Sequence, residues 1–437
     1  MGVGTGMGAA RTFLLWTFLR AMSHRGYVLA SSLYFVVVAR LSAGELILLG
    51  TVVAATMLVS DIPAGAWSDT VSRRWSLVAG HGLLAAGMVM TGFVTAFPWI
   101  VVTQVLWGLG WALSAGADVA WLTDELTGPD RAAGRPAGDP ARRPAGDPAG
   151  RPAGDPAGPD GIARVLAAAA RWELAGGAAG MVVFGVLGWA AGLWVAIVVS
   201  GAGVALAGLY VAARFTERGF TPVTHRRRAA SLSTLRRGLA LARRDREIRL
   251  VLAATMIVNG ATMITWIFPR QLVALGFPAG DPTLWYTGLG ILASLAGVVA
   301  LRAVEGRIGG AGVVRRAYVL ACLAGVLGLL VLAWAPVALL GGLGMLLVTG
   351  ICDPLTRVAS VVWVNRRTTS DVRATVQSFL SQAETGGEIV GGLALAALAQ
   401  SAGPVTALLA AGLLIACAGA VIGPRASRRP STPDGLG

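Results

Sequence analysis

The chain has 437 residues, of which 55% are hydrophobic and only 13% are charged. Soluble domains carry about 25% charged residues, so this chain cannot cover its surface with groups that favour water. The composition excludes a soluble globular protein and predicts a polytopic membrane protein.

The net charge is +14, and all 36 basic residues are arginine. A strongly basic chain can bind nucleic acid, but that function requires a basic face on a folded domain. Here the arginines flank apolar runs instead, so we expect no nucleic-acid partner.

An α-helix needs about 20 predominantly apolar residues to cross the hydrocarbon core of a bilayer. In chain order the sequence contains twelve such runs, at residues 15–39, 45–66, 76–97, 99–122, 162–187, 190–213, 250–269, 284–302, 317–334, 337–362, 374–398 and 404–422. The predicted fold class is an all-α polytopic membrane protein with twelve transmembrane helices. Each of two stretches, 171–180 and 381–392, has a glutamate followed closely by a glycine pair, which indicates two pseudo-symmetric six-helix bundles.

The arginines are concentrated in alternate loops of this topology, at residues 73–74, 131–151, 214–249, 302–316, 366–373 and 425–429. Cytoplasmic loops accumulate basic residues, so we expect both termini in the cytoplasm and the chain in the inner (plasma) membrane. No cleavage site follows the first apolar run, which predicts a membrane span rather than a signal peptide.

The largest polar break is a central cytoplasmic loop at 214–249. It separates an N-terminal bundle (1–213) from a C-terminal bundle with a short tail (250–437). Within it, residues 232–248 are either an amphipathic helix on the anionic inner leaflet or a solvated basic linker.

A second break, at 128–161, contains repeats of RPAGDPA at a strict eight-residue period. Proline at this frequency forbids a helix, and no apolar side chain larger than Ala or Pro is present to pack. We predict a disordered cytoplasmic insertion that interrupts the first bundle; a docking segment is the alternative.

The cysteines and histidines favour neither a disulfide framework nor a metal site. Cys322, Cys352 and Cys417 all lie inside predicted spans, and the three histidines are scattered along the chain. We expect no cofactor and no metal.

The stretch IPAGAWSDTVSRRWSL, residues 62–77, places Gly65, Asp69, Arg73 and Arg74 between the second and third predicted spans. This spacing resembles the signature Gly-x-x-x-Asp-x-x-x-Arg-Arg/Lys of the major facilitator superfamily.

The resemblance covers essentially the whole chain apart from 128–161, and a weaker echo of the motif follows span eight at 301–316. Two positions depart from the pattern, since Thr70 replaces a common basic residue and Ser72 replaces the usual glycine.

The resemblance implies a cytoplasmic gate. In such proteins the motif aspartate, here Asp69, faces the N-terminal end of span eleven, and the first arginine, Arg73, pairs with an acid at the end of span four. Asp124 occupies that place, with Glu125 as the next candidate. A carboxylate is favoured at a helix N-terminus, and the arginine can form charge-assisted bonds with both acids. The alternative is a purely topological role for the arginines.

Ionisable side chains inside a bilayer are costly and face protein or water. The predicted spans contain ten that draw attention, namely His24, Arg25, Asp61, Asp118, Arg171, Glu173, Asp353, Arg357, Glu384 and Glu388. These positions supply the candidates for substrate binding and proton coupling.

In span four, Trp107, Trp111, Ser114 and Asp118 follow one another at steps of 4, 3 and 4, which places them on one helical face. Two indoles and a carboxylate that face a cavity suit a cationic or amphipathic organic molecule. The alternatives are tryptophan packing against a neighbouring helix and a buried ion pair between Asp118 and Arg171.

Arg25, Asp61 and Arg171 are further cavity candidates, although mutual neutralisation of Arg25 and Asp61 is favoured for that pair. Glu173 and Glu384 have no basic partner at i±3 or i±4 on their own helices. An unpaired buried carboxylate suits a proton-coupling group, so these two residues are the candidate coupling acids, with Asp118 as a third.

The predicted function is secondary active transport by alternating access, in the form of proton-coupled export of small amphipathic molecules such as drugs or a metabolite. The alternative is a nutrient importer or uniporter of the same fold, and a membrane enzyme or a non-transporting sensor is more remote. The resemblance is weaker in span four, where Gln104 stands at the position of an arginine in proton-coupled members. We expect substrate, protons and the bilayer as partners, and a monomer.

Overall fold

The computed structural model of the chain describes residues 2–127, 159–217, 220, 240, 243–278, 281–305, 311–368 and 372–423. Regular structure in these ranges is helical, and no strand occurs in them. Residues 128–158 of the predicted insertion and most of the central loop lie outside the described residues. Of the segment predicted at 232–248, only residues 240 and 243–248 are described, and the last three of them begin a helix.

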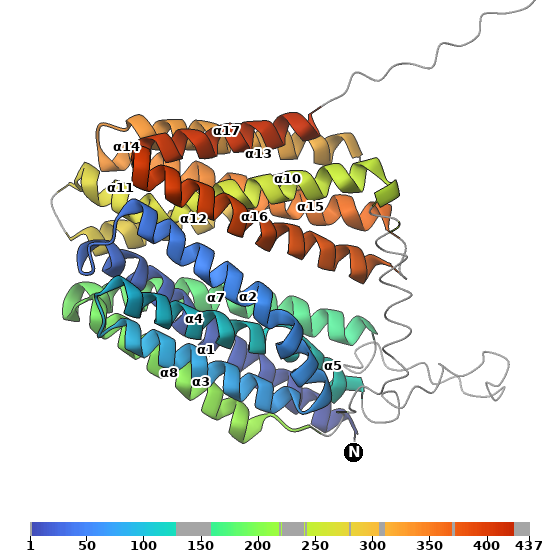
Figure 1. The fold of residues 1–437 in the computed structure, drawn as a ribbon. Helices are drawn as coiled ribbons and strands as arrows, with labels where there is room; N and C mark the ends of the chain where they lie inside the picture. Colours follow the sequence, from blue (N-terminus) through green and yellow to red (C-terminus); the bar gives the residue numbers. More distant parts are fainter. Residues whose placement is uncertain are drawn as a thin grey trace, which may run out of the picture.

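The first half of the chain forms one bundle, drawn in blue and green in Figure 1. Its helices are α1 (Gly2–Val37), α2 (Ala43–Thr70), α3 (Arg73–Thr91), α4 (Phe97–Ser114), α5 (Ala117–Thr127), α7 (Pro159–Ala191) and α8 (Leu193–Arg214). Helix α1 packs on α7 and α8, and α3 packs on α4 and α8.

The second half forms another bundle, drawn from yellow to red. It contains α10 (Arg246–Thr262), η2 (Met263–Ile267), α11 (Phe268–Leu275), α12 (Pro282–Glu305), α13 (Ala311–Trp334), α14 (Ala338–Met345), η3 (Leu346–Cys352), α15 (Asp353–Arg367), α16 (Arg373–Ala402) and α17 (Pro404–Ile422). Helix α10 packs on α16 and α17, and α13 packs on α14 and α17.

Nine helical stretches of the described chain are long and apolar enough to cross a membrane. They coincide with nine of the predicted spans. The other three predicted spans correspond to α1, α3 and α16, which are long enough but do not meet the same measure of hydropathy and charge. The all-α membrane fold is confirmed, and the number of spans remains a prediction.

The short connection between α2 and α3 brings the motif residues together. Helix α2 continues through Pro63 to Thr70, and after one intervening residue Ser72 caps α3 by accepting a hydrogen bond from the backbone N–H of Trp75 at 3.0 Å. Ser72, which stands where the family motif usually has glycine, therefore stabilises the start of the next helix.

Three of the long helical stretches are not continuous α-helices. The stretch predicted at 99–122 breaks between α4 and α5, where Gly116 adopts φ +76°, a left-handed conformation that glycine tolerates. The 3₁₀ helix η2 separates α10 from α11, and the π-helix η3 separates α14 from α15. Pro354, in the first turn of α15, thus directly follows a π-helical segment.

The two bundles contact each other at the end opposite the N-terminus. There the first turns of α2 lie against the last turns of α16, and Figure 1 shows these two helices diverging toward the other end. The contact is close because small residues form it: a side chain at Gly44 would meet Ala396 and Gln400, and one at Gly392 would meet Thr51.

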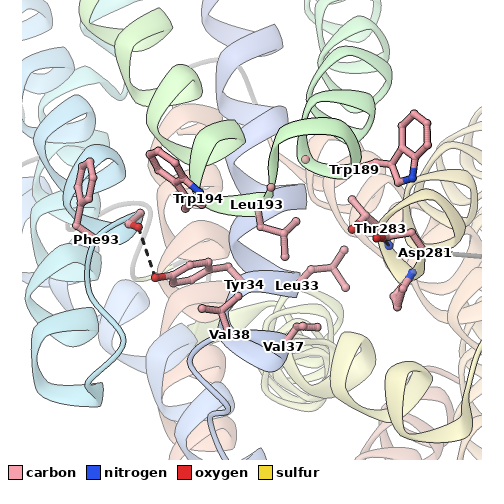
Figure 2. A pocket seen from close by; sticks show the side chains of 14 residues that line it. Leu33, Tyr34, Val37, Val38, Phe93, Trp189, Leu193, Trp194, Asp281 and Thr283 are labelled. Atoms are coloured by element: carbon pink, nitrogen blue, oxygen red, sulfur yellow. Dashed lines mark hydrogen bonds between the residues drawn. The ribbon is translucent and has the colours of Figure 1, made fainter.

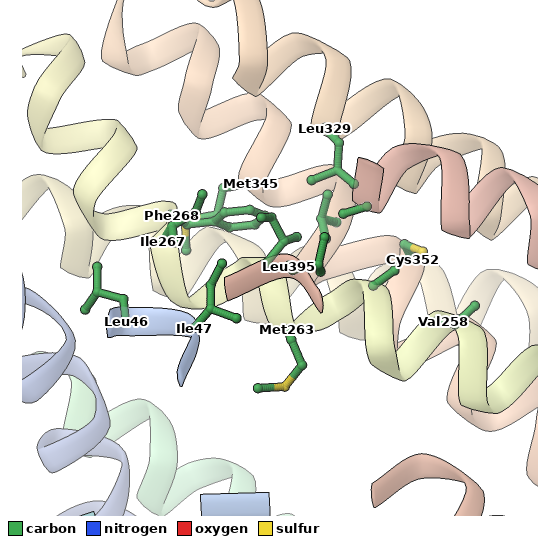
Figure 3. Close-up of a cluster of buried hydrophobic side chains, with 14 of the residues drawn as sticks. Leu46, Ile47, Val258, Met263, Ile267, Phe268, Leu329, Met345, Cys352 and Leu395 are labelled. Atoms are coloured by element: carbon green, nitrogen blue, oxygen red, sulfur yellow. The ribbon is translucent and has the colours of Figure 1, made fainter. Parts of the chain in front are cut away.

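A continuous apolar core seals this end. Figure 3 shows Leu46 and Ile47 of α2 beside Met263, Ile267 and Phe268 of the second bundle. At its edge, Nη1 of Arg270 donates a hydrogen bond to the carbonyl oxygen of Leu41 at 2.9 Å. This contact gives a role to an arginine that is an exception to the predicted charge asymmetry.

At the end that carries the N-terminus, the facing helices are exposed. On α2, Asp61 is exposed and Ile62 has 80% of its surface accessible, and on α7, Trp172 and Leu174 are 44% and 64% accessible. A side chain placed at Gly65 would meet nothing within 4 Å. The bundles therefore touch at one end and are separated at the other.

Candidate functional site

The motif arginine Arg73 forms the expected ion pair with Asp124. Its Nε lies 2.8 Å from Oδ2 of the carboxylate, and the two side chains are only 15% and 22% exposed. Neither atom forms a hydrogen bond, because donor and acceptor are not aligned. The contact is therefore an ion pair. The pair joins the start of α3 to the end of α5 within the first bundle.

Asp69, by contrast, is 52% exposed and lies 3.8 Å from Arg73, four residues away on the chain. In the described part of the molecule it has no ion pair with α16. This arrangement is half of the gate that the family resemblance implies: the pairing inside the first bundle is present, and the contact across to the second bundle is not made in this conformation.

The second motif arginine, Arg74, and its neighbours hold the segment that leaves α8. Glu217 accepts hydrogen bonds from the Ser72 hydroxyl at 2.7 Å and from the backbone N–H of Arg74 at 2.8 Å. The Arg74 side chain donates to the carbonyl oxygen of Ala212. A carboxylate at the N-terminus of α3 is favoured by the helix dipole. Through these hydrogen bonds, Glu217 links the beginning of the central loop to the motif at residues 65–74.

Arg20, in the middle of α1, is the centre of a charge cluster in the first bundle. Its Nη2 lies 4.0 Å from Oδ2 of Asp118 and 3.8 Å from Oε1 of Glu173. The guanidinium carbon also lies 4.7 Å from the ring centre of Trp16 and 5.8 Å from that of Trp111. The single positive charge of Arg20 therefore lies close to two carboxylates and to the faces of two indole rings.

Next to this cluster, three aromatic rings stack. The rings of Trp107 and Trp111 are 5.5 Å apart and nearly parallel, and the His24 ring lies 5.4 Å and 4.9 Å from them. The indole Nε1 of Trp107 and the Nε2 of His24 are buried without a hydrogen-bond partner. Trp107 and Trp111 lie on one face of α4, as their spacing predicts, and both rings pack against His24 of α1.

The same prediction is wrong for Ser114. Its hydroxyl donates to the carbonyl oxygen of Gly110 at 3.0 Å, and the side chain is buried against Gly80 of α3. The helix then breaks at Gly116, so Asp118 belongs to the first turn of α5. The extrapolated helical face therefore ends at Trp111, and Asp118 reaches the cluster from a separate helix.

The ion pairs expected for Asp118 and Asp61 are also different in the structure. Asp118 lies beside Arg20 rather than Arg171, and Arg171 is exposed. Within the described ranges no ion pair joins Arg25 to Asp61, and both side chains are exposed. Glu173 has a basic neighbour after all, but on another helix.

In the second bundle, Arg357 of α15 faces three carboxylates. Asp353 is one turn earlier on α15, and Glu384 and Glu388 are one turn apart on α16; Arg357 interacts electrostatically with all three. Arg357 is exposed and the carboxylates are half-buried. The cluster carries more negative than positive charge, so protons or another cation can neutralise it.

Local spacing in the sequence did not identify Arg20 and Glu217, because their partners are distant along the chain. Asp118 lies 98 residues from Arg20, and Arg74 lies 143 residues from Glu217. A signal for Arg20 was available, however. Trp16, Arg20 and His24 recur at steps of four, which places one cation and two rings on a single face of the first predicted span.

No protein-family model matches this chain, and no curated protein sequence matches it. Solved structures do share its fold. A mutant of the nucleoside transporter NupG matches with a TM-score of 0.73 at 13% identity, over 95% of this chain and 98% of that chain.

A bacterial homologue of the human lysosomal transporter Spinster, in an inward-facing and unoccupied conformation, matches with a TM-score of 0.68 at 15% identity, over 96% of each chain. A POT family transporter in complex with 5-aminolevulinic acid matches with a TM-score of 0.65 at 11% identity, over 94% of this chain and 95% of that chain. The chain has the fold of these membrane transporters.

Proposed function

We propose that the chain is a secondary active transporter that exports small amphipathic organic cations in exchange for protons. Its two bundles rock about a central cavity, and both termini lie in the cytoplasm. With this orientation the conformation described above is inward-facing, because the bundles meet at the outer end and their inner ends are separated. The outward-facing state requires α2 and α16 to approach each other near Gly65 and Asp69.

The observation that carries the proposal is the composition of the Arg20 cluster. Two carboxylates, Asp118 and Glu173, share one guanidinium, and the Trp107–Trp111 stack lies beside them. A cation with aromatic or aliphatic groups gains ion pairing and ring stacking at such a site. Glu173 is 57% exposed, so it is accessible to a substrate.

The Arg357 cluster supports proton coupling. Glu384 keeps its predicted role as a coupling acid, and Glu388, one turn away on α16, joins it. Three carboxylates around one arginine bind protons when no organic cation is near, and they release them when positive charge approaches. This competition is the basis of exchange.

Import of a polar nutrient is the second candidate, since nucleoside and POT transporters share the fold. Polar nutrients require amide side chains that are available for hydrogen bonding. Gln104 instead donates to the Tyr27 hydroxyl at 3.0 Å, and Gln377 donates to Asn365 at 2.8 Å. These amides are used within the bundles, which favours the export of apolar cations.

The test is ethidium transport by the purified protein in liposomes with an imposed pH gradient. Wild type should accumulate ethidium against its gradient, and an uncoupler should abolish this. Glu384→Gln and Glu388→Gln should retain exchange of ethidium for ethidium while losing the response to pH. If wild type neither transports ethidium nor responds to the pH gradient, the proposal is wrong. If ethidium transport by both variants keeps its full response to pH, proton coupling lies elsewhere.

A further inference from the structure

A cavity lies at the end where the two bundles meet. Its volume is about 710 Å³, within the range of about 300–1,000 Å³ that is typical of small-molecule sites. We call it the outer pocket; its walls include Tyr34, Val38, Phe93, Trp189, Trp194 and Asp281. Figure 2 shows these side chains around the opening.

The turns that surround the outer pocket hold its aromatic side chains in place. Gly192, between α7 and α8, has φ +99°, and this left-handed turn separates Trp189 from Trp194. The Tyr34 hydroxyl donates to the carbonyl oxygen of Val94 at 3.3 Å, which ties α1 to the connection between α3 and α4. Trp189 and Trp194 are 53% and 50% exposed although they belong to a folded wall.

Asp281 is the charged residue of this wall. Its Oδ1 accepts a hydrogen bond from the backbone N–H of Thr283 at 2.7 Å, which orients the carboxylate at the start of α12. No arginine in the described part of the chain lies within ion-pair distance of it, and no basic side chain lines the pocket. A negative charge among aromatic rings selects a cation with a large apolar body.

We propose that the outer pocket binds an amphipathic organic cation, with its charged group beside Asp281 and its apolar groups against Tyr34, Trp189 and Trp194. An anionic or zwitterionic lipid headgroup is disfavoured because its phosphate would find no cationic partner. The site is distinct from the central cavity of the proposed transport function, and binding to it does not depend on that function.

The outer pocket is built from both bundles. Asp281 and Thr283 belong to the second bundle, and the aromatic wall belongs to the first. Opening of this end would separate the two walls, so an occupant that contacts both stabilises the closed arrangement. If the proposed alternating access is correct, such a cation inhibits transport without entering the central cavity.

The experiment measures thiol labelling in the full-length protein. Cys417, the exposed native cysteine, is first replaced by alanine, and Val38→Cys is introduced in the pocket wall, where Val38 is 46% exposed. Maleimide labelling is followed with and without tetraphenylphosphonium, and with tetraphenylborate as the anion of matched shape. At a probe concentration about ten times its Kd, labelling should slow about tenfold with the cation and remain unchanged with the anion.

Two variants decide the interpretation. Asp281→Asn retains an oxygen that can cap α12 but removes the charge, so it should abolish the protection. Val337→Cys, at the same end of the molecule and 47% exposed, should label at the same rate with and without the cation. Phe93→Cys, on another part of the wall, is a second reporter if labelling of Val38→Cys is too slow to measure.

Protection that persists in Asp281→Asn would overturn the proposal. Protection that is lost instead in Asp118→Asn would assign the effect to the central cavity and also overturn it. The assay does not measure transport, so protection in a chain that fails to move ethidium would support the outer pocket and refute only the proposed function.

Discussion

The carboxylate of Asp124 lies 2.8 Å from the guanidinium of Arg73, whereas Asp69, on the preceding helix, lies 3.8 Å from the same group and is largely in solvent. The two acids of the proposed gate therefore differ in what they contact in this conformation. One neutralises a half-buried arginine inside the first bundle. The other remains available for a contact that forms elsewhere.

This difference predicts that Asp124→Asn destabilises the protein and that Asp69→Asn does not. Removal of one partner from a buried ion pair costs about 3–5 kcal/mol, and an exposed pair is worth about 0.2–1 kcal/mol. For the half-buried Arg73–Asp124 pair we expect about 1–3 kcal/mol, measured as a lower Tm of the purified protein. Equal Tm values for the two variants would contradict the assignment; Asp69→Asn should instead impair transport.

Glycine substitutions near the two ends of α2 should shift the conformation in opposite directions. At Gly392, which faces Thr51 of α2, a larger side chain would push the outer ends apart, whereas at Gly65 it meets open space in this conformation. Gly392→Val should shift the population toward the outward-facing state, and Gly65→Val should hold the protein inward-facing and stop transport. Distances between spin labels on the two bundles measure both shifts. The rocking model would be refuted if both substitutions changed the distance between the spin labels in the same direction.

The Arg20 cluster contains a matched pair of acids. Asp118 and Glu173 lie 4.0 Å and 3.8 Å from the same guanidinium, but their side chains are 14% and 57% exposed. Since solvent weakens the second pair, Asp118→Asn should cost about 1–2 kcal/mol of stability and Glu173→Gln less than about 1 kcal/mol. Thermal unfolding checks the order. Arg20→Gln should cost more than either, and Asp118→Asn in that background should restore part of the loss.

Asp245 predicts a specific acid sensitivity outside the membrane. Burial acts to raise its pKa, but hydrogen bonds from the backbone N–H of Ile248, from Arg367 and from the backbone N–H of Glu247 outweigh this, so the pKa lies below its ordinary value. A lowered pKa in the folded state stabilises the fold above the unfolded-state pKa of about 3.9, and this contribution disappears as the pH falls through the folded-state value.

Wild type should therefore have a higher Tm than Asp245→Asn at neutral pH, and the difference should shrink below about pH 4. The asparagine still caps α10, so the comparison isolates the charge. A difference in Tm that stays constant down to pH 3 would show that the carboxylate is not preferentially ionised in the folded state.

Several parts of this molecule could be predicted from sequence because they depend on local information. Apolar run length located the helices, and the family resemblance implied that Arg73 pairs with Asp124. The common face of Trp107 and Trp111 on α4 followed from helical periodicity. Each of these relations involves either neighbours on one helix or a family pattern.

The remaining features depend on contacts between helices that local spacing does not encode. Arg20 meets Asp118 and Glu173 only because α1, α5 and α7 converge. Asp118 was assigned to the wrong helix because helical periodicity was extended across Gly116, where the backbone takes a left-handed turn. The small residues around that position were a signal that the helix could end there.

The broken path of three membrane-crossing stretches has a mechanical consequence. A regular helix resists bending along its length, but a 3₁₀ segment, a π-helical turn and a glycine break are points of low flexural stiffness. Two of them, at 263–267 and 346–352, lie in the second half, and one, at 115–116, lies in the first. Each half is thus a jointed assembly rather than a stiff lever. In the proposed alternating-access cycle, single helices would flex to open a passage before the halves rotate as whole bodies.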